Sequence, residues 1–280
     1  CRAGSTTTSR WEAPSPGTRI VHFDVDPMVI GANLPTEVGV VGDLRLALEM
    51  VNAELDRRDH GASTFGGAAA VADIKRRKFE IFDHIAAETD HPIRPERVIA
   101  ALMKVLPPDA TVVSDPGTPC PYASAYYRQA LAGRHVITNR AHGALGYSLS
   151  ASLGAWYGRP ESKTVALMGD GSFGFTVGEL ETVCRARAPI TFVVFSNANF
   201  GWIKASQMAD KGSRYYNVDF NRVDQSAVAA AYGVKSWRVE NPAELDHVLA
   251  EAVAHDGPTL VDIVTQPLEE ANAPVRCWMG

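Results

Sequence analysis

The chain has little cysteine, and the cysteines that it has are scattered. Only four occur among 280 residues, at Cys1, Cys120, Cys184 and Cys277. None of them stands at the short spacing that metal-binding cysteines require. We therefore expect a reduced, cytoplasmic protein without a cysteine-bound metal.

The sequence also lacks an excess of basic residues and lacks long apolar runs. Lysine plus arginine number 27 against 32 acidic residues, which gives a formal net charge of −5 and argues against general nucleic-acid binding. No apolar run approaches membrane-spanning length, and no signal peptide is evident, so we expect no membrane partner. The chain begins with Cys1 rather than Met, which is consistent with an altered or trimmed start. The hydrophobic content of 46% is enough for a substantial core in one or two domains.

The stretch from Thr164 to Trp202 has the pattern of a strand, a helix and a second strand. Apolar runs of this kind are typical of parallel strands that are buried on both faces. Because the strands of a βαβ unit are parallel, their C-terminal ends meet at one edge of the sheet. Asp170 and Asn197 follow those ends, so we expect them close together where open α/β sheets bind ligands. The three segments are Thr164–Met168, Gly169 to about Arg187, and Ile190–Phe195.

The turn after the first of these strands is suited to an anion. Gly169 and Gly171 allow a tight turn, and the helix that follows points unpaired N–H groups outward. Ser172 can add a hydroxyl group. Asp170 would repel a phosphate unless a cation lay between the two.

A cation at this place would find oxygen ligands on both turns. The Asp170 carboxylate, the Asn197 amide oxygen and a backbone carbonyl near Asn199 suit Mg²⁺, which keeps further positions for diphosphate oxygens and water. The sequence thus predicts a clamp for Mg²⁺ and a diphosphate. The alternative is an ordinary βαβ unit with a tight turn and a capping asparagine.

This two-part pattern resembles the cofactor signature of thiamine diphosphate (ThDP) enzymes, in which GDG is followed by a helix, a strand and an Asn-rich turn. The usual Asn-Asn pair is Ser196-Asn197 here, so one asparagine is replaced. The resemblance implies that the metal ligands are the side chains of Asp170 and Asn197 and the carbonyl of Asn199. A NAD-binding Rossmann domain is disfavoured because GDGSFG lacks the GxGxxG pattern.

The resemblance extends to the turns that hold the rest of the cofactor. In the family, a GxxG turn lies beneath the thiazolium–pyrimidine hinge, and its bulky apolar residue, here Leu145, holds the V-shaped conformation. Leu145 could instead be a plain core residue, and His142 could face the active site or be a satisfied structural histidine. These two are the candidate catalytic residues. The implied cofactor-binding residues are Gly117, Thr118, Gly143, Leu145, Gly169, Asp170, Gly171, Ser172, Asn197, Asn199, Phe200 and Gly201.

The fold class that we predict is α/β. A ThDP-binding (PP) domain with a parallel sheet is expected over residues 91–280, after a linker at 56–90; within this domain, residues 122–131 are predicted to be helical. Residues 1–55, with HFDVDPMVIGAN and VVGD, resemble the last part of the Rossmann-like central domain of acetohydroxyacid synthase-like enzymes. Relatives can hold FAD or ADP there, but the preceding half of that domain is absent and nucleotide binding is doubtful. Asp24 and Asp26 either contact a ribose or cap strand ends.

The resemblance implies the cofactor-binding subunit of a split ThDP-dependent decarboxylase or carboligase for 2-oxo acids, acetolactate synthase-like. Such enzymes cleave or form a C–C bond next to a carbonyl through the thiazolium ylide. The glutamate that activates the cofactor belongs to a pyrimidine-binding domain, so we expect a separate subunit to supply it, in a heterotetramer. Alternatives are a ThDP-dependent 2-hydroxyacyl-CoA lyase and a non-catalytic regulatory or scaffold subunit that retains the fold.

Overall fold

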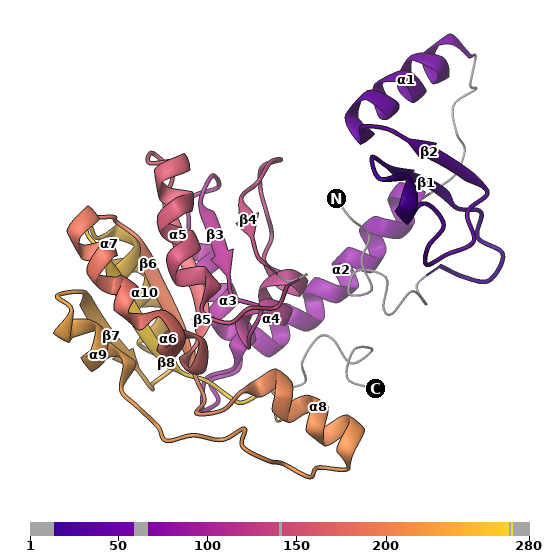
Figure 1. Cartoon of the computed structure of the whole chain (residues 1–280). Helices are drawn as coiled ribbons and strands as arrows, with labels where there is room; N and C mark the ends of the chain where they lie inside the picture. Colours follow the sequence, from indigo (N-terminus) through magenta and orange to yellow (C-terminus); the bar gives the residue numbers. More distant parts are fainter. Residues whose placement is uncertain (1–13, 59–66, 140–141, 269, 271–280) are drawn as a thin grey trace. The chain divides into compact units, whose positions relative to one another are not determined.

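The computed structural model describes residues 14–58, 67–139, 142–268 and 270. Two compact units divide the chain, Cys1–Ile74 and Lys75–Gly280, and each is described by itself (Figure 1). Helix α2 (Gly67–Ala86) begins in the first unit and ends in the second, within the segment predicted as a linker. Among the described residues, no helix combines the length and the apolar character needed to cross a bilayer.

A six-stranded parallel sheet is the centre of the second unit, as the predicted α/β class requires. Its four inner strands are buried along their whole length, which is why their sequences are nearly continuous apolar runs rather than alternating ones. In spatial order the strands are β4 (Val136–Ile137), β3 (Thr111–Ser114), β5 (Thr164–Gly169), β6 (Thr191–Ser196), β8 (Thr259–Val264) and β7 (Lys235–Val239).

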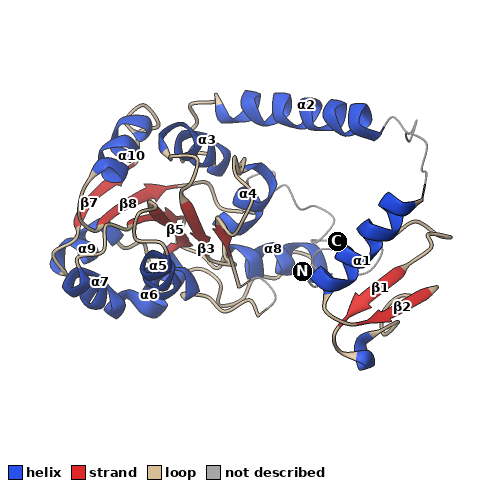
Figure 2. Cartoon of the chain, turned by 90° about the horizontal axis from the view of Figure 1, so that it is seen from above, coloured by secondary structure: helices blue, strands red, loops and turns tan. Residues whose placement is uncertain are grey.

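Helices cover both faces of this sheet, as Figure 2 shows from above. Alternate residues of a strand point to opposite faces, so Leu167 of β5 packs on one side and Met168 on the other. One face carries α3 (Pro95–Val105), α4 (Pro119–Tyr126) and α10 (Leu245–Ala254). The other carries α5 (Tyr147–Gly158), α6 (Asp170–Thr176), the 3₁₀ turn η2 (Val177–Glu179), α7 (Leu180–Ala186) and α9 (Gln225–Ala231).

Helix α4 lies earlier than the range 122–131 predicted from the sequence. It begins at Pro119, whose fixed φ suits the first helical position and whose missing N–H costs nothing there. It ends at Tyr126, because Tyr127 is already extended with φ −66° and ψ 119°. The loop after β3 is therefore short, and this brings Gly117 and Thr118 directly to the carboxyl edge of the sheet.

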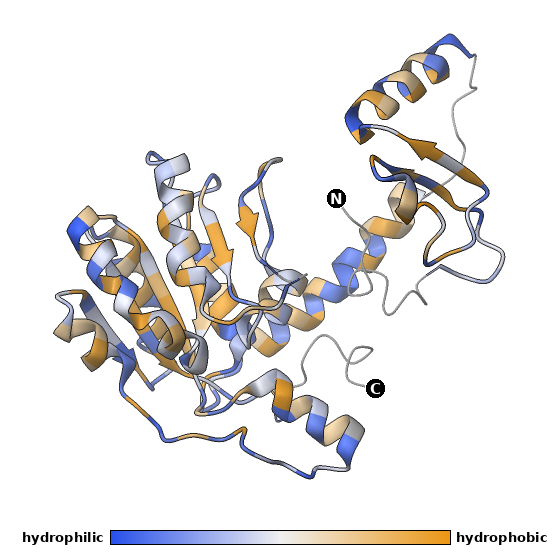
Figure 3. Cartoon of the chain, in the orientation of Figure 1, coloured by the Kyte–Doolittle hydropathy of each residue, from blue (hydrophilic) through white to orange (hydrophobic). Residues whose placement is uncertain are grey.

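The described part of the first unit is a small fragment of two parallel strands followed by a helix, without a buried core. Strands β1 (Val21–Asp24) and β2 (Val38–Val41) pair in parallel, with the 3₁₀ turn η1 (Pro27–Val29) between them and α1 (Leu44–Arg57) after them. Figure 3 shows apolar residues on these strands and on α1, yet none of the unit's described residues is buried.

The two aspartates of β1 and its turn act as caps. Asp24 Oδ1 accepts a hydrogen bond from the backbone N–H of Asp26 at 2.9 Å, and Asp26 Oδ1 accepts one from Met28 N–H at 2.9 Å. The second bond caps η1. Both side chains thus accept bonds from nearby backbone N–H groups, Asp24 at the end of β1 and Asp26 at the start of η1 rather than at a strand end.

Candidate functional site

The residues that follow β5 and β6 meet at the carboxyl edge of the sheet. The two strands are parallel neighbours, with Gly169 opposite Phe195, so the turns after them lie side by side. Asp170 Oδ2 accepts hydrogen bonds from the backbone N–H groups of Asn197 at 2.9 Å and Ala198 at 2.7 Å. Its Oδ1 accepts one from Gly171 N–H at 2.9 Å. The carboxylate thus links the start of α6 to the turn that carries Asn197.

The turn after β6 is held in an uncommon backbone conformation. Ala198 has φ 60°, in the left-handed region that costs a residue with a Cβ about 1 kcal/mol or more. This conformation lets two successive N–H groups point at the same oxygen of Asp170. A short antiparallel bridge between Asn199 and Asp219 holds the far side of the turn. Backbone strain at such a turn indicates a functional constraint.

Two asparagine side chains in this turn have buried polar atoms without a hydrogen-bond partner among the described residues. These atoms are Oδ1 and Nδ2 of Asn197 and Oδ1 of Asn199. A buried polar group left unpaired costs about 1–3 kcal/mol, so a ligand that satisfies these atoms would be favoured. The carboxylate and amide oxygens of this edge are the donor set that Mg²⁺ takes. No cluster of three or more His, Cys, Asp or Glu side chains suitable for a metal occurs in the described part of the chain.

The electrostatics of Asp170 also favour a cation. Burial raises the pKa of its carboxyl group to about 6, although the N–H groups of Ala198, Gly171 and Asn197 oppose this change. The nearby charge of Asp262 adds to the increase. An unpaired buried carboxylate is costly in this place, and a bound metal ion would stabilise the charged form.

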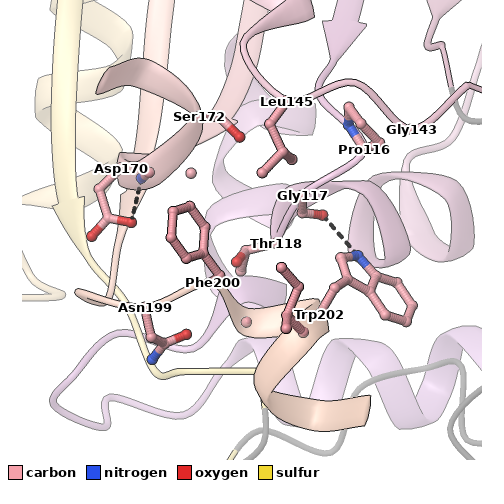
Figure 4. Close-up of a pocket in the computed structure, with 14 residues that line it drawn as sticks. Pro116, Gly117, Thr118, Gly143, Leu145, Asp170, Ser172, Asn199, Phe200 and Trp202 are labelled. Atoms are coloured by element: carbon pink, nitrogen blue, oxygen red, sulfur yellow. Dashed lines mark hydrogen bonds between the residues drawn. The ribbon is translucent and has the colours of Figure 1, made fainter. Parts of the chain in front are cut away.

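A pocket opens beside Asp170, and most of the predicted cofactor residues line it (Figure 4). Asn197 adjoins this pocket through Asp170. His142 is exposed and lies outside the lining. The lining comprises Pro116, Gly117, Thr118, Gly143, Leu145, Gly169, Asp170, Gly171, Ser172, Asn199, Phe200, Gly201, Trp202 and Ile203.

The glycines of this pocket hold space open for a ligand. A Cβ at Gly117 would lie 3.3 Å from Ser172 Oγ and 3.5 Å from Leu145 Cδ2. Figure 4 shows Leu145 and Ser172 directed toward the same part of the pocket. Gly146, directly after Leu145, has φ 85°, and a Cβ there would lie 2.9 Å from Thr176. Only glycine fits the position that turns the chain into α5.

Helix α8 (Gly201–Lys211) closes the pocket on a third side. Trp202 in its first turn donates a hydrogen bond from Nε1 to the Gly117 carbonyl at 3.1 Å. The indole therefore spans from α8 to the loop after β3. Beside Ile203 and Leu145, it makes this end of the pocket apolar, in contrast to the polar end at Asp170.

Sequence reasoning did not find Asp262, which anchors the residue before Asn197. Asp262 lies in β8 and is fully buried; it accepts hydrogen bonds from Ser196 Oγ, from Gln225 N–H at 3.0 Å and from Arg238 Nη1 at 2.6 Å. Ser196 stands where ThDP enzymes usually have asparagine, and the serine hydroxyl here binds this carboxylate. The sequence did contain one signal for this residue. Asp262 is a lone acidic residue within the apolar run of β8, and a buried charge requires partners.

Comparison with known proteins agrees with this geometry. Residues 115–263, just over half of the chain, match the family model described as "Thiamine pyrophosphate enzyme, C-terminal TPP binding domain", thiamine pyrophosphate being another name for ThDP. The chain is 26% identical over 281 residues to the "Probable acetolactate synthase large subunit" of Methanococcus aeolicus, covering 95% of this chain and 46% of that protein.

Two further relatives have the same partial coverage. The catabolic acetolactate synthase of Raoultella terrigena is 29% identical over 257 residues, covering 91% of this chain and 44% of the relative. The pyruvate oxidase of Lactiplantibacillus plantarum is 27% identical over 246 residues, with coverages of 87% and 40%. The chain thus spans less than half the length of the curated relatives that it matches. By the match over residues 115–263, it belongs to the thiamine pyrophosphate enzyme family and carries that family's C-terminal TPP-binding domain.

Proposed function

We propose that the carboxyl edge of the sheet binds Mg²⁺ and, through it, the diphosphate of ThDP. Asp170 would supply the charged ligand, Asn197 its side-chain oxygen and Asn199 its backbone carbonyl. The observation that carries this proposal is the buried, unpartnered amide of Asn197 beside a buried carboxylate. An ordinary capping asparagine would have its side-chain amide paired. The start of α6 faces the same pocket, and its backbone N–H groups would contact diphosphate oxygens.

At the other end of the pocket, Leu145 would support the bend of the cofactor between its two rings. Its side chain approaches Gly117 from the turn before α5, so a ring lying over Gly117 would rest against it. When bound, ThDP supplies an electron sink for a carbanion next to a carbonyl group. The residues of this chain would bind the diphosphate, orient the cofactor and exclude water. They carry no protonatable group to the apolar end of the described pocket.

We further propose that the reaction is C–C bond cleavage or formation on 2-oxo acids, as in the acetolactate synthases that the chain resembles. The apolar wall of Leu145, Trp202 and Ile203 suits the short apolar side chain of such a substrate. The relatives over most of the chain include acetolactate synthases and a pyruvate oxidase, and these names support a 2-oxo acid over an acyl-CoA substrate.

The pyrimidine end of the cofactor would need residues that this site does not provide. Asp170 is the only carboxylate in the described pocket lining, and it is used at the metal end. We propose that the activating glutamate comes from a pyrimidine-binding domain on a separate subunit, in a heterotetramer. The cofactor would then lie between the two domains and stabilise their association.

The test is an assay of 2-oxo acid decarboxylation and of C–C bond formation with ThDP and Mg²⁺. The chain is assayed alone and together with a candidate subunit that carries a pyrimidine-binding domain. Activity should appear only in the mixture and should be lost with Asn197→Ala, while Thr191→Val at the opposite edge of the sheet should retain it. Full activity of the chain alone would contradict the separate subunit. Absence of Mg²⁺-dependent ThDP binding would contradict the site itself.

A further inference from the structure

Asp115 directly precedes the pocket-lining residues Pro116 and Gly117, and its side chain contacts the starts of two helices. It directly follows β3 and is fully buried. Its Oδ1 accepts a hydrogen bond from Ser172 Oγ at 3.1 Å. Its Oδ2 accepts two from Ser148, one from the backbone N–H and one from Oγ, both at 3.1 Å. One carboxylate therefore joins the first turn of α6 to the first turn of α5.

These two helix starts belong to different parts of the site. Ser172 stands two residues after Asp170, at the polar end where the diphosphate would bind. Ser148 stands three residues after Leu145, the residue that would support the bend of the cofactor. Asp115 itself leads into Gly117, where a Cβ would lie 3.3 Å from Ser172 Oγ and 3.5 Å from Leu145 Cδ2. Three of the four segments that line the pocket thus converge on this one side chain.

In the described structure the charge of Asp115 is compensated by these donors and by the backbone N–H of Gly146. No lysine, arginine or histidine among the described residues forms an ion pair with it, in contrast to the buried Asp262, which pairs with Arg238. Burial raises the pKa of the Asp115 carboxyl group, and the hydrogen bonds from Ser148 and Ser172 lower it. Because hydrogen bonds to a buried charge are stronger than those between neutral groups, they restrict where both helix starts can lie.

We propose that Asp115 is a positioning residue that couples the diphosphate end of the site to the end at Leu145. This inference rests on the proposed binding of ThDP and Mg²⁺. Asp115 does not touch the cofactor in this account. It fixes the distance between Ser172 and Leu145, so that a ligand held at the diphosphate end meets Leu145 in the correct place.

Two ligands separate this role from a general loss of stability. Inorganic pyrophosphate with Mg²⁺ uses only the diphosphate end, whereas ThDP with Mg²⁺ uses both ends. Dissociation constants for both are measured by calorimetry on the 280-residue chain and on Asp115→Ala, Leu145→Ala and the double variant. Asp115→Ala should weaken ThDP binding about tenfold more than pyrophosphate binding, since one hydrogen bond to a buried charge is worth about that factor.

The double variant gives the decisive comparison. If Asp115 positions Leu145, the loss of ThDP affinity caused by Leu145→Ala should be smaller in the Asp115→Ala background than in the wild-type background. Asp115→Asn, which keeps an acceptor for Ser148, should recover most of the ThDP affinity. Thr191→Val removes a buried hydroxyl that bonds Ala252 and Thr259 at the opposite edge, and it should leave the ratio of the two affinities unchanged.

Equal losses for the two ligands in Asp115→Ala, or independent effects of the two substitutions, would overturn the inference. The same is true if Thr191→Val changes the ratio as much as Asp115→Ala does. If Asp115→Ala does not fold, Ser148→Ala removes one donor and should show the same preference at smaller amplitude. A wild-type chain that binds neither ligand would refute the proposed cofactor site and this inference together, whereas unchanged ratios with intact binding refute this inference alone.

Discussion

The two units of the chain differ in how far their apolar side chains are buried. In the second unit, every residue of β5, β6 and β8 is buried, and helices cover both faces of the sheet. In the first unit, none of the described residues is buried, and leucines of α1 such as Leu46 and Leu48 are 50% and 44% exposed. Burial of apolar surface is the main stabilising contribution to a fold. The difference indicates that the second unit carries its own stability and the proposed site with it.

Asp170→Ala, in the unit that carries the proposed site, is expected to have the largest effect. ThDP with Mg²⁺ should raise the melting temperature of the wild-type second unit, because a ligand that binds only the native state stabilises it. Loss of the charged metal ligand should lower ThDP affinity on the order of a hundredfold, since the metal retains only neutral oxygens from this chain. Calorimetric titration measures the ThDP affinity, and scanning calorimetry measures the increase in melting temperature. If ThDP with Mg²⁺ raised the melting temperature of the variant as much as that of the wild type, the assignment of Asp170 would be contradicted.

A matched pair of leucine substitutions compares the two units directly. Leu167 of β5 is fully buried, so Leu167→Ala should lower the free energy of unfolding by about 2–5 kcal/mol. Leu48→Ala on α1 should change it by less than about 0.5 kcal/mol, because the side chain is already half in water. Urea titration followed by circular dichroism gives both values. Equal costs at the two positions would mean that the first unit has a core that its described residues do not show.

Leu145→Ala should act on turnover more than on cofactor affinity. The substitution loosens the support of the cofactor bend and leaves the diphosphate contacts in place. Misplacement of reacting groups by a fraction of an ångström costs about tenfold to a hundredfold in rate. Steady-state kinetics of the assembled enzyme, with ThDP titrated at each variant, separates turnover from affinity. Wild-type turnover in the variant would identify Leu145 as a plain core residue.

The smallest expected effect concerns the pH dependence of stability. Burial lowers the pKa of Lys163 in the second unit from 10.5 to about 8 in the folded state. Between about pH 8 and pH 10.5 the unfolded chain therefore binds more protons at this site, and this contribution to stability rises with pH. Lys163→Met should flatten the slope in that window. Arg19→Met in the first unit should not, since the exposed arginine pairs with Glu37 at the surface and does not titrate there.

The parts of the site that follow from local patterns could be predicted from the sequence. The two apolar runs around GDG predicted parallel strands, and this placed Asp170 beside Asn197, as the structure does. The bonds of Asp115 and Asp262 could not be predicted in this way. Their partners lie between 24 and 66 residues away along the chain, and tertiary packing alone decides which donors a buried carboxylate meets.

Helix boundaries and the structure of the segment before the sheet could not be predicted from local patterns either. The small-residue composition before α2 is typical of a linker, but Phe79 and Phe82 place an apolar stripe on this helix that packs against the sheet unit. Its helical spacing was the signal available in the sequence. The tail at residues 266–280 has no core-forming period, and its sequence predicts either a lid over the substrate or an irregular terminus. It lies largely outside the described residues, so both alternatives stay predictions.

The central claim is that Asp170, Asn197 and Asn199 hold a divalent cation for the diphosphate of ThDP. The most direct test is a crystal structure of the chain with Mn²⁺ in place of Mg²⁺ and with ThDP or pyrophosphate, recorded at a wavelength where manganese scatters anomalously. The account predicts one strong anomalous peak in contact with Asp170, the Asn197 side-chain oxygen and the Asn199 carbonyl, with diphosphate oxygens completing the coordination. A cofactor bound without manganese at these residues, or manganese bound elsewhere in the pocket, would contradict it.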